Sequence, residues 1–230
     1  MTKEEKRVLL ALCIGDGYVR EKTNGVTKMM YGEFSVTHCP EQLAYLEWKL
    51  NKIHSILGGK KPKIYSQYRR QSKDGKRPLF DKCIKKGHPY FKVLRRFLYQ
   101  NGVKTLRRQV LNKLSLLGII IWYLDDGSLN KLYNRQTNKI KTYHVKISLK
   151  GNYSQIVEIQ TYFKEVWNLN WRINKTMNQD NYVLRMGKHE GEKFLKLIYP
   201  FVKAEIPSML YKVDASLNTR AQKADNTAKI

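Results

Sequence analysis

Apolar residues change their spacing along the chain, and each change predicts a new element. Residues 4–15 carry apolar side chains along one helical stripe, and residues 40–59 return to that spacing before Gly58-Gly59. Between them, residues 18–38 alternate like strands around Asn24-Gly25, a strong hairpin signal. A second hairpin turning near Asp74-Gly75 and a helix over 88–102 complete the first half.

The second half repeats this order of elements. It is predicted to contain, in order, a helix over 112–124, a hairpin over 127–150, a helix over 152–169, a hairpin over 170–188 and a helix over 189–202. The unit helix–hairpin–helix–hairpin–helix therefore occurs twice, at a period of about 110 residues. This predicts one half over 1–108, a second over 109–217 and a flexible polar tail over 218–230.

An aspartate ends the opening helix of each half. Asp16 lies in ALCIGDGYV and Asp126 in IWYLDDGSL, each followed by glycine and then a strand. One Asp-Gly after a helix is often only a cap and a turn, but two at matching places of a repeat favour a shared chemical role. If the helices pair across a pseudo-twofold axis, the two carboxylates meet at helix ends that already carry partial negative charge. A hard divalent ion such as Mg²⁺ would balance them.

Net charge indicates the class of partner. Lys and Arg total 44 against 19 Asp and Glu, which gives +25 and a pI of about 9.9. Nucleic acid is the first candidate for such a basic protein. An anionic membrane is second, but there is no basic amphipathic helix and no apolar run of membrane-spanning length. A basic protein without a polyanionic partner is the remaining alternative.

The cysteines argue against disulfides and zinc. There are three, an odd number without a CxxC motif, and Cys39 and Cys83 lack a four-ligand spacing although His38 and His88 lie nearby. The N-terminus lacks the layout of a signal peptide. We therefore expect an intracellular, reducing compartment, either an organelle matrix or a bacterial or phage-infected cytoplasm.

The paired acids and the basic charge together favour metal-assisted phosphodiester hydrolysis, in which a metal activates water and stabilises charge on oxygen. Two related sites would serve the two strands of a duplex.

The segments LLALCIGDG (9–17) and IIIWYLDDG (119–127) resemble the two signature motifs of the monomeric LAGLIDADG homing endonucleases. The resemblance implies an α+β fold of two pseudo-symmetric αββαββα halves, with two antiparallel sheets forming a saddle around a central two-helix interface. It also implies a monomer that cuts double-stranded DNA at a long, asymmetric site with Mg²⁺, for which Mn²⁺ or Ca²⁺ would substitute in binding.

The resemblance assigns roles to individual residues. Asp16 and Asp126 would bind the metal, while Gly15 and Asp125, one position earlier, would contribute mainly backbone carbonyls. For Asp125 the alternative is a minor supporting group beside the metal. Further segments, NGVKTL and PSMLYKV, resemble the places where a family member carries lysines of its active site. This implies catalytic roles for Lys104 and Lys212, consistent with a cation stabilising developing charge.

The small residues that let the motif helices approach are unevenly placed. The first motif has Ala11 and Gly15, whereas the second has bulkier residues and Gly118 lies just outside it. We therefore expect asymmetric packing, an asymmetric target and unequal metal sites.

Strand alternation and the polar loop after residue 130 predict the DNA-reading surface. The predicted DNA-binding residues are Tyr18, Arg20, Lys22, Lys63, Tyr65, Gln67, Arg69, Lys131, Asn134, Arg135, Lys139, Lys141, Lys146, Ser148, Arg172, Asn174, Thr176 and Arg185. For any one of them an ordinary solvated strand position is the alternative.

A second function stays open. An intron maturase that binds intron RNA, or a non-catalytic DNA-binding regulator of the same fold, would need the basic surface without needing the acids.

Overall fold

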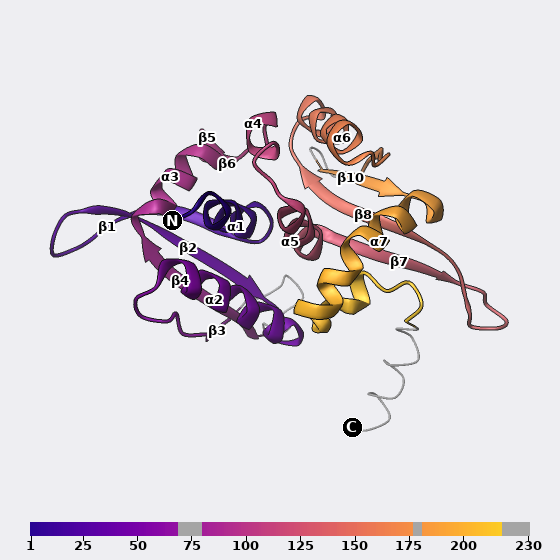
Figure 1. Cartoon of the computed structure of the whole chain (residues 1–230), viewed down its shortest axis with the longest axis horizontal. Helices are drawn as coiled ribbons and strands as arrows, with labels where there is room; N and C mark the ends of the chain where they lie inside the picture. The colour runs from indigo at the N-terminus through magenta and orange to yellow at the C-terminus, as the bar shows by residue number, and fades with distance from the viewer. Residues whose placement is uncertain (69–79, 177–180, 218–230) are drawn as a thin grey trace, which may run out of the picture. The chain divides into compact units, whose positions relative to one another are not determined.

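The structure is a computed structural model that describes residues 1–68, 80–176 and 181–217. The chain divides into two compact units, Met1–Asp125 and Asp126–Ile230 (Figure 1). This division falls inside a helix, 17 residues after the repeat boundary expected at 108, because it follows packing while the repeat follows sequence order. The predicted turn at Asp74-Gly75 and the tail over 218–230 lie outside the described residues. Within those residues no helix combines the length and apolarity that crossing a bilayer requires.

The first unit follows the predicted order helix, hairpin, helix, hairpin, helix. Its elements are α1 (Lys3–Ile14), β1 (Tyr18–Thr23), β2 (Met30–His38), the 3-10 turn η1 (Pro40–Gln42), α2 (Leu43–Leu57), β3 (Tyr65–Tyr68), β4 (Phe80–His88), α3 (Pro89–Leu98), β5 (Tyr99–Gln100), β6 (Val103–Lys104) and α4 (Arg108–Leu111). The next helix, α5 (Leu116–Asp126), starts four residues later than expected.

The second unit repeats the plan after α5. Its elements are β7 (Gly127–Tyr133), β8 (Ile140–Lys150), α6 (Tyr153–Trp167), β9 (Arg172–Lys175), β10 (Asn181–Met186), α7 (Lys188–Glu205) and the 3-10 segment η2 (Pro207–Lys212). The sequence did not predict η2, β5, β6 or α4, all of which are too short to give a periodic signal.

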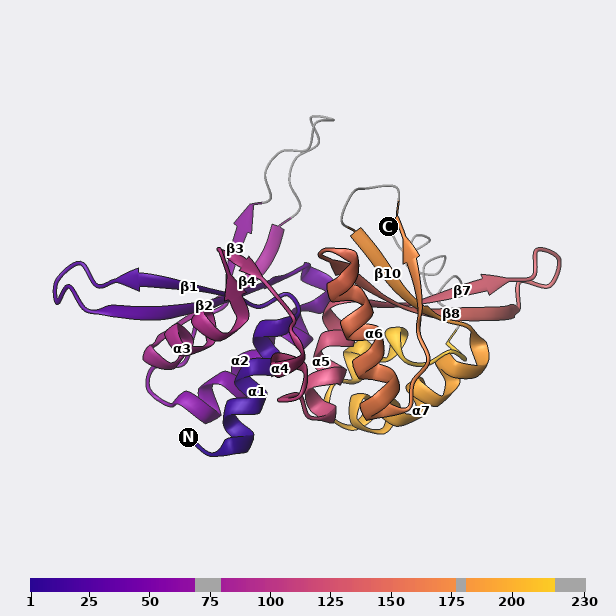
Figure 2. The same cartoon turned by 90° about the horizontal axis from the view of Figure 1, so that it is seen from above.

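Each unit is built on one four-stranded antiparallel sheet. The strand orders are β1-β2-β4-β3 and β7-β8-β10-β9, so corresponding strands occupy corresponding places. Figure 2 shows α2 and α3 on the same side of the first sheet, and each contacts its strands. Apolar side chains point to the helix-covered side of a sheet: in β8, Val145, Ile147 and Leu149 are buried while alternate residues are more exposed. The opposite face is left for polar residues.

The repeat is regular to the residue over its first half. Met30 and Ile140 open β2 and β8, while Leu43 and Tyr153 open α2 and α6, so the offset is 110 residues in both cases. Helices α2 and α6 are each 15 residues long. Positions in the two halves can therefore be compared by adding 110.

The hairpin tips confirm this correspondence. Asn24 and Asn134 each accept hydrogen bonds, through the side-chain oxygen, from the backbone N–H groups two and three residues later. The left-handed residues are Lys28 (φ 55°) and Asn138 (φ 51°). The expected hairpin turning at Asn24-Gly25 is confirmed, and the Asn24 side chain organises its loop, which ends at Met29.

Candidate active site

Helix α1 carries the first motif acid out of the core. Thr2 and Glu5 form a capping box at its start, and residues 9–14 are buried without interruption. Gly15 caps its end, and the side chain of Asp16 is 40% exposed. A buried helix thus delivers one carboxylate to solvent at its C-terminal end.

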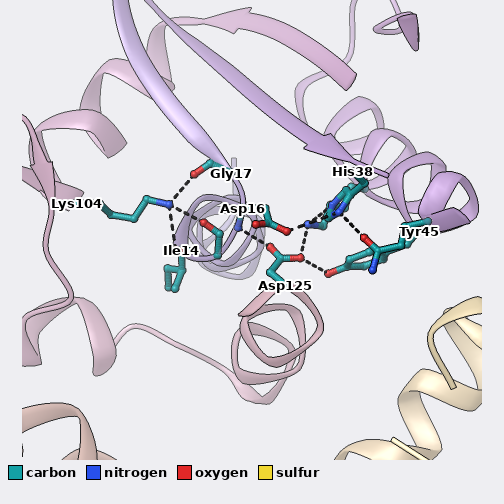
Figure 3. Close-up of polar contacts among 10 residues, drawn as sticks. Ile14, Asp16, Gly17, His38, Tyr45, Lys104 and Asp125 are labelled. Carbon is teal, nitrogen blue, oxygen red and sulfur yellow. Dashed lines mark hydrogen bonds and ion pairs between the residues drawn. The ribbon is translucent and has the colours of Figure 1, made fainter. Parts of the chain in front are cut away.

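Asp125, next to the second motif acid, points into the first unit instead. Its side chain is fully buried. One oxygen, Oδ2, accepts a hydrogen bond from the backbone N–H of Asp16 at 2.9 Å. The other, Oδ1, accepts from the Lys49 ammonium at 2.6 Å and from the Tyr45 hydroxyl at 2.9 Å (Figure 3). Both oxygens of Asp125 therefore accept hydrogen bonds. One donor is the backbone of Asp16, just after α1, and the other two, Tyr45 and Lys49, lie on α2.

Lys49 fixes the tautomer of His38. The Lys49 side chain is fully buried, and its Nζ lies 3.0 Å from Nε2 of His38 and 4.4 Å from the centre of the Tyr45 ring. An ammonium group only donates, so Nε2 must accept and the proton must reside on Nδ1. That Nδ1–H donates to the side-chain oxygen Oε1 of Gln42 at 3.0 Å, and Oδ2 of Asp16 lies 3.6 Å from the same nitrogen. The N–H edge of the imidazole is therefore next to the motif acid.

The environment keeps Asp125 ionised. Burial by itself raises the pKa of a carboxyl group, but the charge of Lys49 and the hydrogen bonds from Lys49 and the Asp16 N–H outweigh it. The pKa of Asp125 consequently lies below its ordinary value of 3.8. Asp125 and Lys49 form a buried ion pair whose remaining hydrogen-bonding capacity is also satisfied.

The two motif helices come closest at small residues. A Cβ on Gly15 would overlap the side chain of Asp125, and a Cβ on Gly118 would lie 3.6 Å from that of Ala11. Gly118, outside the second motif, thus provides the small position that the motif itself lacks. The expected asymmetric approach of the helices stays a prediction.

Lys104 binds the end of α1. Its Nζ donates to the carbonyl oxygens of Ile14, Gly15 and Gly17 at 3.1, 2.7 and 2.7 Å (Figure 3). These carbonyls carry the partial negative charge of a helix C-terminus, which the ammonium offsets. The Gly15 carbonyl, predicted as a metal ligand, is therefore already an acceptor for Lys104. Although Lys104 is far from Asp16 in sequence, it binds the residues on both sides of that acid.

The other predicted catalytic residues lie at or beyond the start of the second unit. Asp126 is half-buried as the last residue of α5, and Lys212 is half-buried at the end of η2. Their roles stay predictions.

Asp16, His38 and Asp125 form a group of potential metal ligands whose atoms lie within 4.8 Å of one another. No other such group occurs in the described part of the chain. The Lys49 ammonium contacts both Asp125 and His38, so these two side chains are already engaged by a cation, Asp125 as an ion pair and His38 as a hydrogen-bond acceptor. The exposed oxygens of Asp16 are the part of the group that fits a hard divalent ion. The three cysteines are free, as expected.

On the open face of the first sheet, two cations are paired with an acid. Arg20 and Lys22 on β1 contact Glu33 on β2 at 2.6 and 3.1 Å. Burial raises the pKa of Glu33, but hydrogen bonds from the two cations hold it below 4.5. Arg20 and Lys22 lie where the alternation predicted them, with a buried acid between them.

The open face of the second sheet gathers unneutralised cations. Lys146, Arg185 and Arg172 face one another across β8, β10 and β9 in one register row. Among the described residues no ion pair joins any of them to an acid. Burial and the neighbouring charges of Arg185 and Lys146 lower the pKa of His144 on the same strand. Like charges placed side by side on a sheet are unfavourable unless a polyanion covers them.

The remaining predicted DNA-binding residues lie in varied settings. Lys131 donates to the carbonyl of Leu217 at 2.6 Å, so its amine is engaged within the unit. Lys63 precedes β3, and Arg69 lies outside the described residues. Exposed or half-buried positions are found for Tyr18, Tyr65, Gln67, Asn134, Arg135, Lys139, Lys141, Ser148, Asn174 and Thr176. Their contacts with DNA stay predictions.

Sequence reasoning missed Lys49, His38 and Tyr45. One signal was available for Lys49, which lies three residues after Leu46 and four before Ile53, inside the apolar stripe of α2. A lysine on a buried helical face needs a charged partner. Its partner, however, lies 76 residues away in sequence.

The chain is similar to solved structures of homing endonucleases. Among solved structures, it is 19% identical to the homing endonuclease I-WcaI bound to its DNA recognition sequence, with a TM-score of 0.69, covering 92% of this chain and 86% of that one. It is 15% identical to a variant of I-DmoI in complex with its target DNA in the presence of Mg, with a TM-score of 0.52, covering 86% of this chain and 96% of that one. For a complex of I-DmoI with DNA and Ca, the identity is 16% and the TM-score 0.51, with 85% of this chain and 89% of that one covered.

Two curated relatives also match. The protein RecA of Mycolicibacterium flavescens and that of Mycobacterium shimoidei are each 24% identical over 225 residues, 93% of this chain. The chain spans about half the length of these relatives, 47% in each case. The family model for LAGLIDADG DNA endonucleases matches residues 6–194, a segment that contains both motifs and both sheets. On this match, the chain belongs to the LAGLIDADG DNA endonuclease family.

Proposed function

We propose that the protein is a site-specific endonuclease that hydrolyses both strands of a long DNA site with a divalent cation. The observation that carries the proposal is the exposed carboxylate of Asp16, placed at the end of a buried motif helix between Lys104 and the Asp125–Lys49 pair. A structural cap would not need a charged side chain in solvent at a helix end of like polarity.

Asp16 and Asp126 would hold the ion, for which we propose Mg²⁺. The I-DmoI complexes with Mg and with Ca support a divalent ion of this hard class. When bound, such an ion supplies activation of water and stabilisation of charge on the attacked and leaving oxygens. Lys104, already held by three carbonyls, places a fixed positive charge beside that centre.

The second sheet supports a DNA partner. Its row of Lys146, Arg185 and Arg172 presents arginine and lysine groups that suit base edges and phosphates. We also propose that the protein acts as a monomer, since one chain contains both motif helices and both sheets.

The test uses Asp16→Asn and Asp126→Asn, with Asp214→Asn as a matched control outside the site. The substrate is a supercoiled plasmid carrying a site selected by wild-type cleavage of a randomised DNA library. With Mg²⁺, each motif variant should lose at least about a hundredfold in cleavage rate, as expected for removal of a preorganised charged group. Binding of the same duplex should be retained.

Full cleavage by both motif variants would remove the acids from the mechanism. Cleavage absent from the wild type, with splicing of an intron RNA stimulated instead, would favour the maturase alternative. Affinity that does not change between low and moderate salt would contradict any nucleic-acid role, because phosphate contacts release counterions.

A further inference from the structure

We propose that Asp125, Lys49, Tyr45 and His38 form a positioning network that holds Asp16, and that the residues at the matching places of the second half cannot form the same network. The inference rests on the proposed function and deepens it, because it implies that the two motif acids are supported by different residues. None of the four residues is proposed to touch the DNA; each would act through Asp16.

The backbone of Asp16 is held by a side chain that is itself immobile. The Asp125 carboxylate accepts the Asp16 N–H and is fixed in turn by Lys49 and Tyr45 from α2. Three hydrogen bonds fix the positions of both Asp125 oxygens. Because one of these bonds comes from the Asp16 N–H, the Gly15–Asp16 peptide is held in one orientation. A rigid supporting shell of this kind is what a reactive carboxylate needs to keep its geometry.

The side chain of Asp16 is approached from a second direction. The His38 ring is buried, and its Nδ1–H lies 3.6 Å from Oδ2 of Asp16 and 3.0 Å from Gln42. Lys49 sets that tautomer through Nε2. One ammonium group therefore fixes both the carboxylate that holds the Asp16 backbone and the imidazole that faces its side chain (Figure 3).

The second half cannot build the same network. At the offset of 110 residues, the counterparts of His38, Tyr45 and Lys49 are Ser148, Gln155 and Ile159, and the counterpart of Asp125 is Gly15. Ile159 is buried and apolar, and the Gln155 side chain caps its own helix through Asn152. Asp126 is thus a motif acid without a carboxylate–lysine–histidine support at the matching places.

Two variants test the network. In Asp125→Asn the amide has one acceptor oxygen where the carboxylate uses two, so either the Asp16 N–H or the Lys49 and Tyr45 donors must lose their partner. Tyr45→Phe is milder, since it removes one hydrogen bond and keeps the ring, and it serves if Asp125→Asn does not fold. Tyr182→Phe, at a buried tyrosine of the second unit, is the matched control.

The first measurement needs neither metal nor DNA. Hydrogen exchange of the Asp16 amide, observed by NMR, should be slow in the wild type and roughly tenfold faster in Asp125→Asn, the effect of losing one hydrogen bond. The Gln155 amide, bonded to Asn152 in the second half, is the internal reference and should not change. An Asp16 amide that exchanges equally in all variants would overturn the proposal.

The second measurement separates positioning from mere loss of folded protein. Supercoiled plasmid carrying the selected site is cut with Mg²⁺, and the rates for the two strands are followed separately. A positioning role predicts that one strand slows roughly tenfold more than the other in Tyr45→Phe, so that nicked plasmid accumulates. Equal slowing of both strands, or no slowing, would refute it. A wild type that cuts neither strand would instead refute the proposed function.

Discussion

The two sheet faces differ in how they treat charge, although the repeat gives them the same strand order. In the first unit, Glu33 lies between Arg20 and Lys22, and Asp125 is buried against Lys49. In the second, three cations share one row without an acid paired to them among the described residues. These charges of the first unit are therefore paired within the fold, whereas the row of the second sheet is left to be paired by a partner.

Substitutions on the two faces should therefore affect different properties, folding stability in the first unit and DNA affinity in the second. Removing a charged residue from the first unit should mainly destabilise the fold, because its partner is left behind. Removing one from the row of the second sheet should mainly weaken DNA binding and relieve repulsion in the free protein. The following variants are ordered by expected effect.

The largest effect is expected for Lys49→Met. It leaves the Asp125 carboxylate buried without its cation, which should lower the free energy of unfolding by about 3–5 kcal/mol. Urea denaturation followed by circular dichroism measures it. The double variant Lys49→Met/Asp125→Leu removes both charges and should recover part of that loss. A single variant as stable as the wild type would mean that the pair is not buried in solution.

Arg185→Gln should reduce DNA affinity by roughly tenfold and lower the slope of log affinity against log salt by about 1. Fluorescence anisotropy with the selected duplex, across a range of salt concentrations, measures both quantities. Arg20→Gln is the matched control in the first unit and should change the slope less, since Glu33 already offsets its charge. Equal changes in the two variants would remove the distinction between the faces.

Acid should destabilise the wild type through the first unit. The pKa values of Asp125 and Glu33 lie below 3.8 and 4.5, so below about pH 5 the unfolded chain binds more protons than the folded one. Their contribution is present in full above the unfolded pKa values and is lost as the pH falls through the folded ones. Urea denaturation between about pH 5 and pH 3 should show a shallower loss in Lys49→Met/Asp125→Leu. Parallel curves would contradict the assignment.

The smallest effect concerns the hairpin tips, where the two halves agree. Lys28 adopts the left-handed conformation that Asn138 adopts in the second tip. Asparagine tolerates this region better than lysine, so Lys28→Asn should stabilise the protein by about 0.5 kcal/mol. The reciprocal Asn138→Lys should destabilise it by a similar amount. Thermal unfolding of both variants checks the pair, and shifts of the same sign would show that the tips are not equivalent.

The repeated architecture could be predicted because it depends on local spacing. Apolar periodicity indicated the helices and strands, and the two Asp-Gly sequences aligned the halves. The length of the hairpin loop could not be predicted from Asn24-Gly25 alone. The Asn24 side chain binds backbone N–H groups two and three residues later, which favours a longer loop over a two-residue turn. Local chemistry, once known, explains the longer loop.

The site was only partly predictable. Asp16 and Lys104 could be named from motifs, but the network around them joins residues that no local pattern connects. Lys49 and Asp125 are far apart in sequence, and Asp125 was expected to be either a backbone ligand or a minor supporting group beside the metal. The sequence did not indicate that its side chain pairs with a buried lysine. Tertiary contacts of this kind depend on how helices pack, which the spacing of apolar residues does not specify.

The position of the unit boundary inside α5 limits how the protein can be divided. A chain cut between the two repeats at residue 108 would keep Lys49 and lose Asp125, so its first half would contain a buried ammonium group without a carboxylate. Separately expressed halves, or a symmetric dimer of the first half, would therefore require a compensating change at position 49. The repeat is duplicated in sequence, but its first copy is completed only by a residue contributed from the start of the second.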